Sequence, residues 1–411
     1  MKAISFLGTS EYAEVTYIYN DREFRTDLFP EALFHFFPDL ELIYLFATPT
    51  VQAHSNLQRL RERVQSKGKR LEVVPIPEGR SEDELWEIFS GLTGTVAEGE
   101  KVVFDITHSF RSIPFLTFLA AAYLRAARRV TIRAVIYGAY EARPKGDPSP
   151  RPVFDLTPFV FLLDWLAATN QFIHTGDAQY LARLLVREGK NRGSGALKNA
   201  GQELEDFSRA MMLCRPLEVM EKAGRVSAVL RKVSGEFHRW ARPFEVMAGR
   251  IQEEYGRYAL PRPRESVQES LRRQLDLIRW YAGHGQIIQA VTLAREWMVT
   301  AVGWRLFGKF ALSLEERGGI EHGLSGLSRV AQKRSAPDEL NEEGRELQRW
   351  PEAAALSDLW NQLTAVRNDL DHAGMNPSPM SATKLARKAK EEILPALEAL
   401  ARQWGLMEGA E

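Results

Sequence analysis

Between residues 1 and 140, short apolar runs alternate with segments of helical pattern, and this alternation restricts the fold more than any other feature. The apolar runs occupy residues 3–8, 40–47, 70–76, 101–107 and 131–138. Continuous apolar runs of this length are typical of strands buried on both faces, and strands separated by helices pair in parallel. We therefore predict an α/β, Rossmann-like domain with a parallel, doubly wound sheet. The segment 15–27, with Asn20 and Asp21 at its turn, predicts an inserted hairpin.

After residue 165 the strand pattern almost disappears, and long amphipathic segments follow to the end of the chain. Pro261 and Pro263 predict a linker between two helical regions. We therefore predict three domains: the α/β domain at 1–165, an all-α linker domain at 166–262 and a second all-α domain at 263–411. Within the last domain, Pro395 predicts a kinked helix, and the polar stretch 333–346 predicts a loop.

Charge and composition exclude several classes of protein. The 54 basic residues balance the 54 acidic residues, so the broad positive surface of a duplex-DNA-binding protein is not expected. Cys214 is the single cysteine, which rules out an internal disulfide and a CxxC metal site, and it fits a reducing cytoplasm. Since we find neither a bilayer-spanning apolar run nor a secretory signal, we expect a cytoplasmic protein without a membrane partner.

Polar stretches follow four of the predicted strands: "GTSEY" at 8–12, "ATPT" at 47–50, "THSFR" at 107–111 and "YGAY" at 137–140. In a doubly wound sheet, ligands bind beyond the carboxyl ends of the strands. Hydroxyl and backbone N–H groups bind phosphates there, and an arginine can grip one bidentately. The candidate ligand-binding residues are Gly8, Thr9, Ser10, Thr48, Thr50, Thr107, His108, Ser109, Arg111 and Gly138.

Known nucleotide-binding motifs do not explain these stretches. The first strand is not followed by GxGxxG, and the chain has no GxxxxGK[ST] motif, which argues against a dinucleotide site and an NTP-binding P-loop. A purely structural interpretation stays open, in which Thr107 or Ser109 caps a helix and Asp105 is buried in a hydrogen bond. His108 fits ligand contact and packing equally well.

A second candidate site lies in "VRNDLDHAG" at 366–374, where Arg367 and His372 form an R-x4-H pattern with polar Asn368 beside the arginine. The same spacing occurs at Arg279–His284 and at Arg317–His322, so the bare pattern is weak. We expect His284 to lie at a helix end, and the Arg317–His322 stretch to form a loop.

Context favours the Arg367–His372 pair as the functional one. Asn368 and His372 share a helix face, whereas Arg367 lies around the helix from His372. The arginine and histidine therefore converge only if the helix ends or bends, and Gly374 favours such an end. These residues suit metal-free RNA cleavage, in which a histidine moves a proton and an arginine stabilises charge on the phosphate. On the motif alone, an exposed helix end with solvated charges is the favoured interpretation.

Taken together, "GTSEYAEVTYIYNDREF", "DITHSFRSIP" and the later "RNDLDH" resemble the CARF–HEPN ribonucleases of type III CRISPR systems. The stretch "DITHSFR" resembles the DxTHG-type signature of the CARF domain in that family, with Ser109 in place of the glycine. The resemblance covers the first 140 residues well, and in the HEPN region it depends mainly on one short motif.

The resemblance implies a fold and a function. A Rossmann-like CARF domain binds a cyclic oligoadenylate, for which the cyclic tetra-adenylate is the expected ring, and this activator switches on an all-α HEPN domain. The HEPN domains of a homodimer, or of a higher even-numbered oligomer, pair to cleave single-stranded RNA without a metal or other cofactor. By the same resemblance, Arg367, Asn368 and His372 are catalytic.

Two other functions stay open at this point. The chain can be a CARF sensor whose helical half binds DNA or a partner and cuts nothing. It can also be a ring nuclease, in which Thr107, His108 and Ser109 of the CARF domain degrade the cyclic ligand; that activity is compatible with RNA cleavage.

Overall fold

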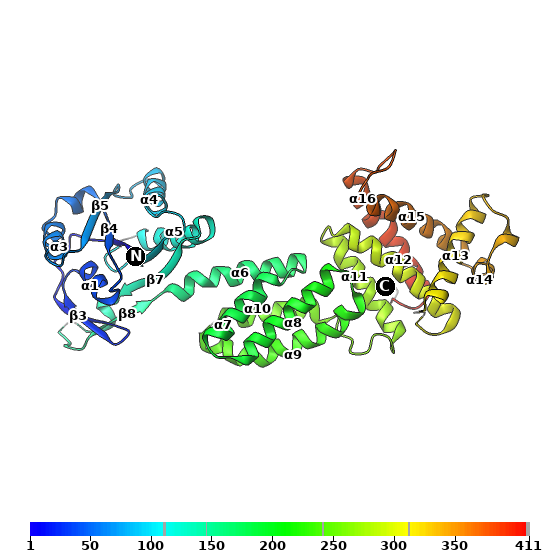
Figure 1. The fold of residues 1–411 in the computed structure, drawn as a ribbon, viewed down its shortest axis with the longest axis horizontal. Helices are drawn as coiled ribbons and strands as arrows, with labels where there is room; N and C mark the ends of the chain where they lie inside the picture. The colour runs from blue at the N-terminus through cyan, green and yellow to red at the C-terminus, as the bar shows by residue number, and fades with distance from the viewer. Residues whose placement is uncertain (110–111, 145, 241, 311–312, 408–411) are drawn as a thin grey trace. The chain divides into compact units, whose positions relative to one another are not determined.

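The structure is a computed structural model (Figure 1). It describes residues 1–109, 112–144, 146–240, 242–310 and 313–407. For residues 236–240 and 242–244 it describes the backbone only. The chain divides into two compact units, Met1–Asp164 and Trp165–Glu411. The division falls inside helix α6, Thr157–Thr175.

The first unit is built on one eight-stranded sheet of order β3-β2-β8-β7-β6-β1-β4-β5. All five strands predicted from apolar runs are present. The strands are β1 Lys2–Phe6, β2 Val15–Tyr19, β3 Arg22–Thr26, β4 Leu42–Ala47, β5 Arg70–Pro75, β6 Lys101–Asp105, β7 Thr131–Gly138 and β8 Arg151–Asp155.

The sheet is mixed, which corrects the prediction of a fully parallel one. Strands β5, β4, β1, β6 and β7 pair in parallel, whereas β8 runs antiparallel to β7. Strand β8 also pairs in parallel with β2, through Arg151 and Pro152 alone. The sequence pattern did not reveal β8 because Pro152 lacks the N–H of a central strand and its run is only half apolar.

The predicted hairpin is present as β2 and β3, which pair antiparallel between Val15 and Thr26. Its two turn residues, Asn20 and Asp21, have φ of 49° and 63°. Two positive φ values are required by the type I′ turn, whose twist matches that of the strands it joins. The local sequence therefore determines this turn.

Helices cover both faces of the sheet, as in a doubly wound fold. Helices α1 (Phe29–Phe36) and α3 (Ser55–Ser66) pack on one core, with Ala3 and Ile43 from the sheet. Helices α4 (Glu82–Gly94) and α5 (Ile113–Arg128) pack on the other, with Ile4 and Phe104. Successive strand residues thus enter opposite cores, and the short helix α2 (Pro49–Gln52) follows β4 at the sheet's carboxyl edge.

The described part of residues 165–411 contains helices and no strand, as the sequence predicts. In Figure 1, α7–α10 lie side by side, and α11–α17 form the rest of the unit. The helices are α7 Gln179–Asn191, α8 Gly195–Met212, α9 Pro216–Trp240, α10 Arg242–Gly256, α11 Val267–Gly283, α12 Ile287–Phe307, α13 Leu314–Ala331, α14 Glu342–Gln348, α15 Ala353–Asp371, α16 Ala382–Lys388 and α17 Leu394–Gln403.

Two local predictions in this unit meet different outcomes. The polar stretch 333–346 is only partly a loop, because the Asn341 side chain accepts a hydrogen bond from Gly344 N–H and starts α14. That cap was present in the sequence and was overlooked. Near Pro395, where a kinked helix is predicted, a π-helical turn, Ala389–Ile393, directly precedes α17.

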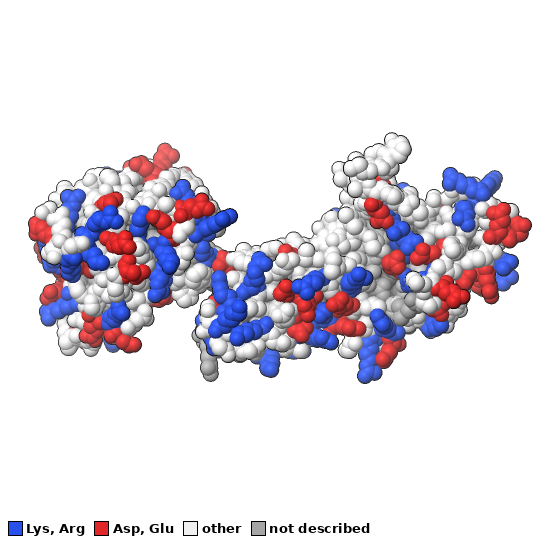
Figure 2. Space-filling view, in the orientation of Figure 1, with Lys and Arg blue, Asp and Glu red and all other residues white. Residues whose placement is uncertain are grey.

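Positive and negative side chains are interspersed on the face that Figure 2 shows, in agreement with the zero net charge. Within the described residues, no helix combines the length and apolar character needed to cross a membrane.

Burial of Trp297 predicts a large contribution to stability. Trp297 is fully buried in the helical unit, and its indole N–H donates to the Leu271 carbonyl at 2.9 Å. We expect Trp297→Ala to lower the free energy of unfolding by about 3–5 kcal/mol, through the cavity it leaves. Urea unfolding followed by helical circular dichroism measures the change. Trp86→Ala is the control, since Trp86 is 69% exposed; equal losses in both variants would contradict this packing.

Candidate functional site

A buried carboxylate, Asp105, organises the carboxyl ends of the central strands. It lies at the end of β6 and is fully buried. Its Oδ2 accepts from Ser5 Oγ of the neighbouring strand β1 at 2.6 Å, and its Oδ1 accepts from Thr107 N–H at 2.9 Å. Burial raises the pKa of Asp105 to about 6, although these hydrogen bonds oppose the rise. The carboxylate thereby connects β1 to the turn after β6.

The two hydroxyls of that turn hold it in place and do not cap helix α5. Thr107 Oγ1 accepts from Gly138 N–H at 2.8 Å, which links β6 to β7. Ser109 Oγ donates to the Ile106 carbonyl at 2.6 Å. Helix α5 has Ser112 as its N-cap residue, without a side-chain hydrogen bond. The prediction that Thr107 or Ser109 caps a helix is therefore wrong. The prediction that Asp105 is buried in a hydrogen bond is confirmed.

His108 is a neutral, packed residue that also faces the pocket. Its Nε2 accepts from Phe29 N–H at 3.3 Å, and its ring lies 4.0 Å from the Tyr12 ring between centroids. Burial lowers the pKa of His108 to about 4. At neutral pH the imidazole therefore carries no charge, and it lines the pocket as a neutral ring.

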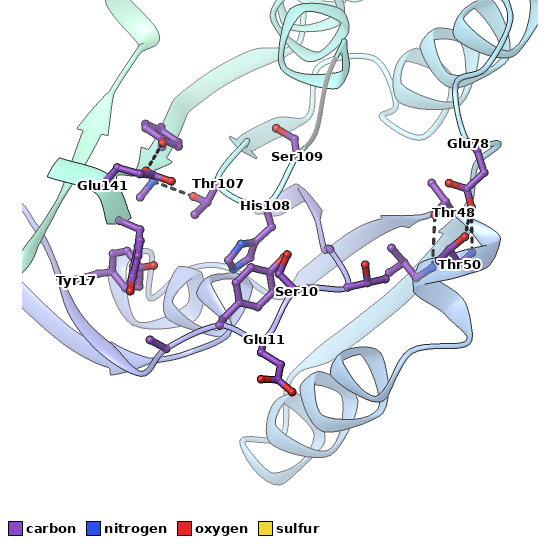
Figure 3. A pocket seen from close by; sticks show the side chains of 18 residues that line it. Ser10, Glu11, Tyr17, Thr48, Thr50, Glu78, Thr107, His108, Ser109 and Glu141 are labelled. Atoms are coloured by element: carbon purple, nitrogen blue, oxygen red, sulfur yellow. Dashed lines mark hydrogen bonds between the residues drawn. The ribbon is translucent and has the colours of Figure 1, made fainter. Parts of the chain in front are cut away.

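The polar stretches after the strands meet in one pocket of about 540 Å³, at the carboxyl edge of the sheet. Figure 3 shows Thr48, Thr50 and Glu78 at one side, Thr107 and Glu141 at the other, and His108 between them. The pocket is lined by these predicted residues: Gly8, Thr9, Ser10, Thr48, Thr50, Thr107, His108, Ser109 and Gly138. Arg111, the tenth, lies outside the described residues.

Two of the lining glycines lie so close to neighbouring side chains that any other residue would place its Cβ atom against them. A Cβ atom at Gly8 would lie 2.4 Å from the Tyr12 hydroxyl, and one at Gly138 would lie 2.6 Å from the Phe29 ring. Both distances are far below van der Waals contact. Glycine at these positions therefore lets the Tyr12 hydroxyl and the Phe29 ring pack directly against the backbone at the pocket.

The sequence interpretation missed several lining residues, notably Tyr17, Glu78, Tyr137 and Glu141. Glu78 follows β5 at the same sheet edge, so the rule that found the other stretches could have found it. Tyr137 stands in the "YGAY" stretch itself, next to Gly138. Tyr17 comes from the hairpin, and nothing in its local sequence indicates that it reaches the pocket.

The lining side chains that the structure describes include three carboxylates, Glu11, Glu78 and Glu141, and neither a lysine nor an arginine. Glu78 accepts from Thr50 N–H at 3.1 Å and from Thr50 Oγ1 at 2.6 Å, and these bonds lower its pKa. Glu141 accepts from the Tyr137 hydroxyl at 2.8 Å. The described pocket thus offers amides, hydroxyls and carboxylates to a ligand.

The second candidate site lies where helix α15 ends. His372 is the C-cap residue, and Ala373 and Gly374 follow with φ of 50° and 71°. The expected helix end after the motif is therefore present. His372 and Asn368 are exposed and Arg367 is half-exposed, with its Nε 3.0 Å from Asp371 Oδ2.

The segment after this helix end is held by a buried aspartate. Asp369 lies one residue past Asn368 and is 6% exposed. Its carboxylate accepts from the Asn376 side-chain amide and, at 2.9 Å, from Met380 N–H. Its carbonyl accepts from Gly374 N–H at 2.9 Å. The chain beyond His372 is thereby folded back onto the helix end, while His372 itself stays exposed to solvent.

The other two R-x4-H pairs have structural surroundings. Arg279 pairs with Glu398 at 2.6 Å, and His284, a C-cap residue as expected, stacks on the Trp280 ring at 4.1 Å. Arg317 pairs with Glu296, and both Arg317 and His322 lie within helix α13. The loop expected there is wrong, because Ser313 caps this helix through Glu316 N–H. Among the described residues, no cluster of three metal-ligating side chains occurs.

Comparison with known proteins agrees with the geometry of the first unit. Residues 2–141 match the family model described as the CARF domain of the CRISPR system endoribonuclease Csx1. The first unit contains a CARF domain. Residues 161–262 match the second domain of CRISPR-associated protein MJ1674. The chain is thus a CARF-containing protein of the CRISPR-associated kind.

Two individual proteins are also similar. MJ1674 of Methanocaldococcus jannaschii is 28% identical over 171 residues, which are 40% of this chain and 25% of that protein. The chain therefore spans about a quarter of that relative's length. The structure of Enterococcus italicus Csm6 bound to cyclic hexa-2′-fluoro-hexa-dAMP covers 99% of this chain and 95% of that chain, with 11% identity and a TM-score of 0.45.

The environment of His108 predicts how stability depends on pH. Its pKa is lowered from 6.5 to about 4, so its contribution to stability is complete above pH 6.5 and is lost as the pH falls through 4. His108→Gln keeps an acceptor for Phe29 N–H and does not titrate. We expect the parent's free energy of unfolding, relative to this variant, to fall by up to about 3 kcal/mol between pH 6.5 and 4.

Urea unfolding at a series of pH values measures this difference. Comparison with His108→Gln cancels the titration of other groups, including Asp105, whose raised pKa acts in the opposite direction. A difference that stays constant down to pH 4 would show that His108 is not buried as described.

Proposed function

We propose that this protein is a single-strand-specific endoribonuclease of CRISPR defence, activated by a cyclic oligoadenylate bound in its CARF pocket. The convergence of nine predicted residues, seven of them with polar side chains, in that one pocket carries the proposal. It is supported by the match of residues 2–141 to the CARF domain of an endoribonuclease family. The proposed domains are the CARF domain at 1–165, a helical linker at 166–262 and a HEPN ribonuclease domain at 263–411.

The proposed ligand fits the chemistry of the pocket. A cyclic oligoadenylate presents phosphates, 2′-hydroxyls and adenine amino groups. The hydroxyls of Thr9 and Ser10, next to Gly8, can bind phosphates, with Arg111 as the proposed cation. Glu11 and Glu141 can accept hydrogen bonds from adenine amino groups or ribose hydroxyls. Two pockets related by a two-fold axis match a ring with an even number of nucleotides, either the tetra- or the hexa-adenylate, and the cyclic tetra-adenylate is the proposed ring.

Arg367, Asn368 and His372 are the proposed catalytic residues of the ribonuclease. The 2′-hydroxyl of RNA attacks the adjacent phosphorus, its proton passes to a base, and an acid protonates the departing 5′-oxygen. His372 serves as one proton-transfer group and Arg367 stabilises the phosphate charge, without a metal. Because one chain offers a single histidine at this site, a second copy supplies the other group, and the protein acts as a homodimer or a higher even-numbered oligomer.

The ribonuclease proposal is tested by substituting the two proposed catalytic residues. We expect His372→Ala to reduce activator-dependent cleavage of a fluorescent single-stranded RNA by about 10²–10⁴-fold, as loss of a positioned proton-transfer group does. Arg367→Ala should reduce it by about 10²–10³-fold, as loss of a group that stabilises developing charge does. Cleavage is measured in EDTA with saturating cyclic tetra-adenylate, and binding of the activator should be unchanged in both variants.

His322→Ala is the matched control, because it removes the histidine of another R-x4-H pair, in the middle of helix α13. It should cleave RNA at the parental rate. If the parent binds the activator and cleaves no RNA, the chain is a sensor without nuclease activity; if it shortens the activator itself, it is a ring nuclease.

The carboxylate of Glu78 predicts a variant with tighter activator binding. Glu78 occupies the Thr50 N–H and hydroxyl, donors that a ligand phosphate can use, and it adds a negative charge to the pocket. We expect Glu78→Gln to lower the Kd for cyclic tetra-adenylate about fivefold, which corresponds to ~1 kcal/mol for unit charges 4 Å apart in water. Isothermal titration at low and high salt measures it, and the gain should shrink at high salt.

Glu72→Gln is the matched control, since it removes the same charge from strand β5 outside the pocket. Tighter binding in both variants would mean that net charge alone sets the affinity. Weaker binding in Glu78→Gln would show that the carboxylate itself contacts the activator.

A further inference from the structure

A second cavity, of about 680 Å³, lies within the helical unit, and it shares no lining residue with the CARF pocket or with the Arg367–His372 segment. Its walls come from the start of helix α9, the loop before α11, and helices α11, α12 and α13. Its volume falls in the range of small-molecule sites. Nothing described so far accounts for it.

The polar lining of this cavity is unusual for a space between packed helices. Gln274 of α11 and Thr300 of α12 both line it, and each is only 3% exposed. Gln274 Nε2 donates to Ser270 Oγ at 3.1 Å, and Thr300 Oγ1 accepts from Arg317 at 3.2 Å. Positions this deep are usually apolar. The inner wall is thus already supplied with hydrogen-bonding groups.

Three arginines at the cavity, Arg215, Arg225 and Arg264, are exposed. Among the residues that the structure describes, none of the three guanidinium groups has a hydrogen bond or an ion pair. This contrasts with the arginines of nearby α12 and α13: Arg295 pairs with Glu321 at 2.8 Å, and Arg317 pairs with Glu296.

The remaining charges of the lining largely cancel one another. Lys222 lies 3.1 Å from Asp206 and 3.8 Å from Glu218. Glu296 is paired with Arg317 and also lies 3.1 Å from Arg295. Among the described lining residues, this leaves the three arginines opposed by the carboxylate of Glu221. The cavity therefore has an excess of positive charge, although the chain as a whole is neutral.

The position of helix α9 strengthens the attraction for an anion. Arg215 directly precedes this 25-residue helix, whose first residue is Pro216, and Glu218, Glu221 and Arg225 recur on one of its faces. The positive end of the helix dipole therefore lies at the cavity beside the unpaired guanidinium groups. Guanidinium forks bind phosphate oxygens bidentately, which makes phosphate a better match than a carboxylate of similar charge.

We propose that this cavity binds the phosphate ester of a nucleotide, with Arg215, Arg225 and Arg264 as its phosphate ligands. Phe310 at the cavity wall offers a ring on which a base can stack, and Glu221 can accept from a base amino or imino group. The same chemistry is presented by a free nucleotide and by one nucleotide unit of an RNA strand. The inference does not depend on the proposed ribonuclease activity.

Direct binding tests the proposal on the full-length chain. The probe is a uridine diphosphate with a fluorescent methylanthraniloyl group, chosen because the CARF pocket is proposed to bind adenines. We expect the combined variant Arg215→Gln, Arg225→Gln, Arg264→Gln to bind this probe at least about tenfold more weakly than the parent. The dependence of its Kd on salt should also be flatter, since fewer cations contact phosphate.

The matched control removes three exposed arginines elsewhere in the same unit, by Arg329→Gln, Arg334→Gln and Arg349→Gln. It should bind the probe as tightly as the parent, and circular dichroism should show that both triple variants are folded. Equal binding by the parent and the cavity variant overturns the proposal, as does equal weakening in the control. Failure of the parent to bind the probe overturns it as well.

Competition then separates the two sources of the phosphate. A 2′-O-methyl uridine decamer, which cannot be cleaved by 2′-hydroxyl attack, is added to the parent with the probe bound. Displacement of the probe assigns the cavity to an RNA strand, and continued binding assigns it to a free nucleotide. In the cavity variant the decamer should lose about as much affinity as the probe if the strand occupies this site.

Discussion

The arrangement of the CARF pocket depends on one buried carboxylate, Asp105. Through Ser5 it joins strand β1 to β6, and through Thr107 N–H it bends the chain at the point where β6 leaves the core. Thr107 then reaches Gly138 of β7, so three adjacent strands share one hydrogen-bonded end. A buried charged group is costly unless it is satisfied, and these hydrogen bonds offset that cost only in this one geometry.

The charge of the pocket has consequences for what it can recognise. His108 is neutral at physiological pH, and the described lining carries glutamates without a lysine or arginine. Within the described lining, amide and hydroxyl donors, which are directional, are the groups available to a phosphate, while the carboxylates suit amino and hydroxyl groups of a ligand.

The helical unit presents its chemistry differently, at a helix end and at an open cavity. The termination of α15 leaves His372 exposed, while buried Asp369 fixes the segment that follows. The cavity beside α9 is lined by residues of two segments: 161–262, which matches the second domain of MJ1674, and the part of the chain that contains helices α11–α13. Arg215, Arg225 and Arg264, whose guanidinium groups have no hydrogen bond or ion pair within the described part of the chain, give the two parts a common polar surface, where a bound anion would join them.

The sequence by itself determined the elements whose signals are local. The five apolar strands, the hairpin turn at Asn20 and Asp21, and the helix end after His372 follow from patterns within a few residues. The rule that ligands bind beyond parallel strand ends also placed nine lining residues correctly in one pocket.

Tertiary structure decided what depends on distant partners. Strand β8 pairs with β2 although it contains Pro152, and Tyr17 reaches the pocket from the hairpin. The Thr107 hydroxyl accepts a hydrogen bond from Gly138 of β7 and does not cap a helix. A local sequence pattern reflects the conformational preference of the residues within it. The pairing of β8, the role of Thr107 and the position of Tyr17 depend instead on contacts with residues that are distant in the sequence and come close only on folding.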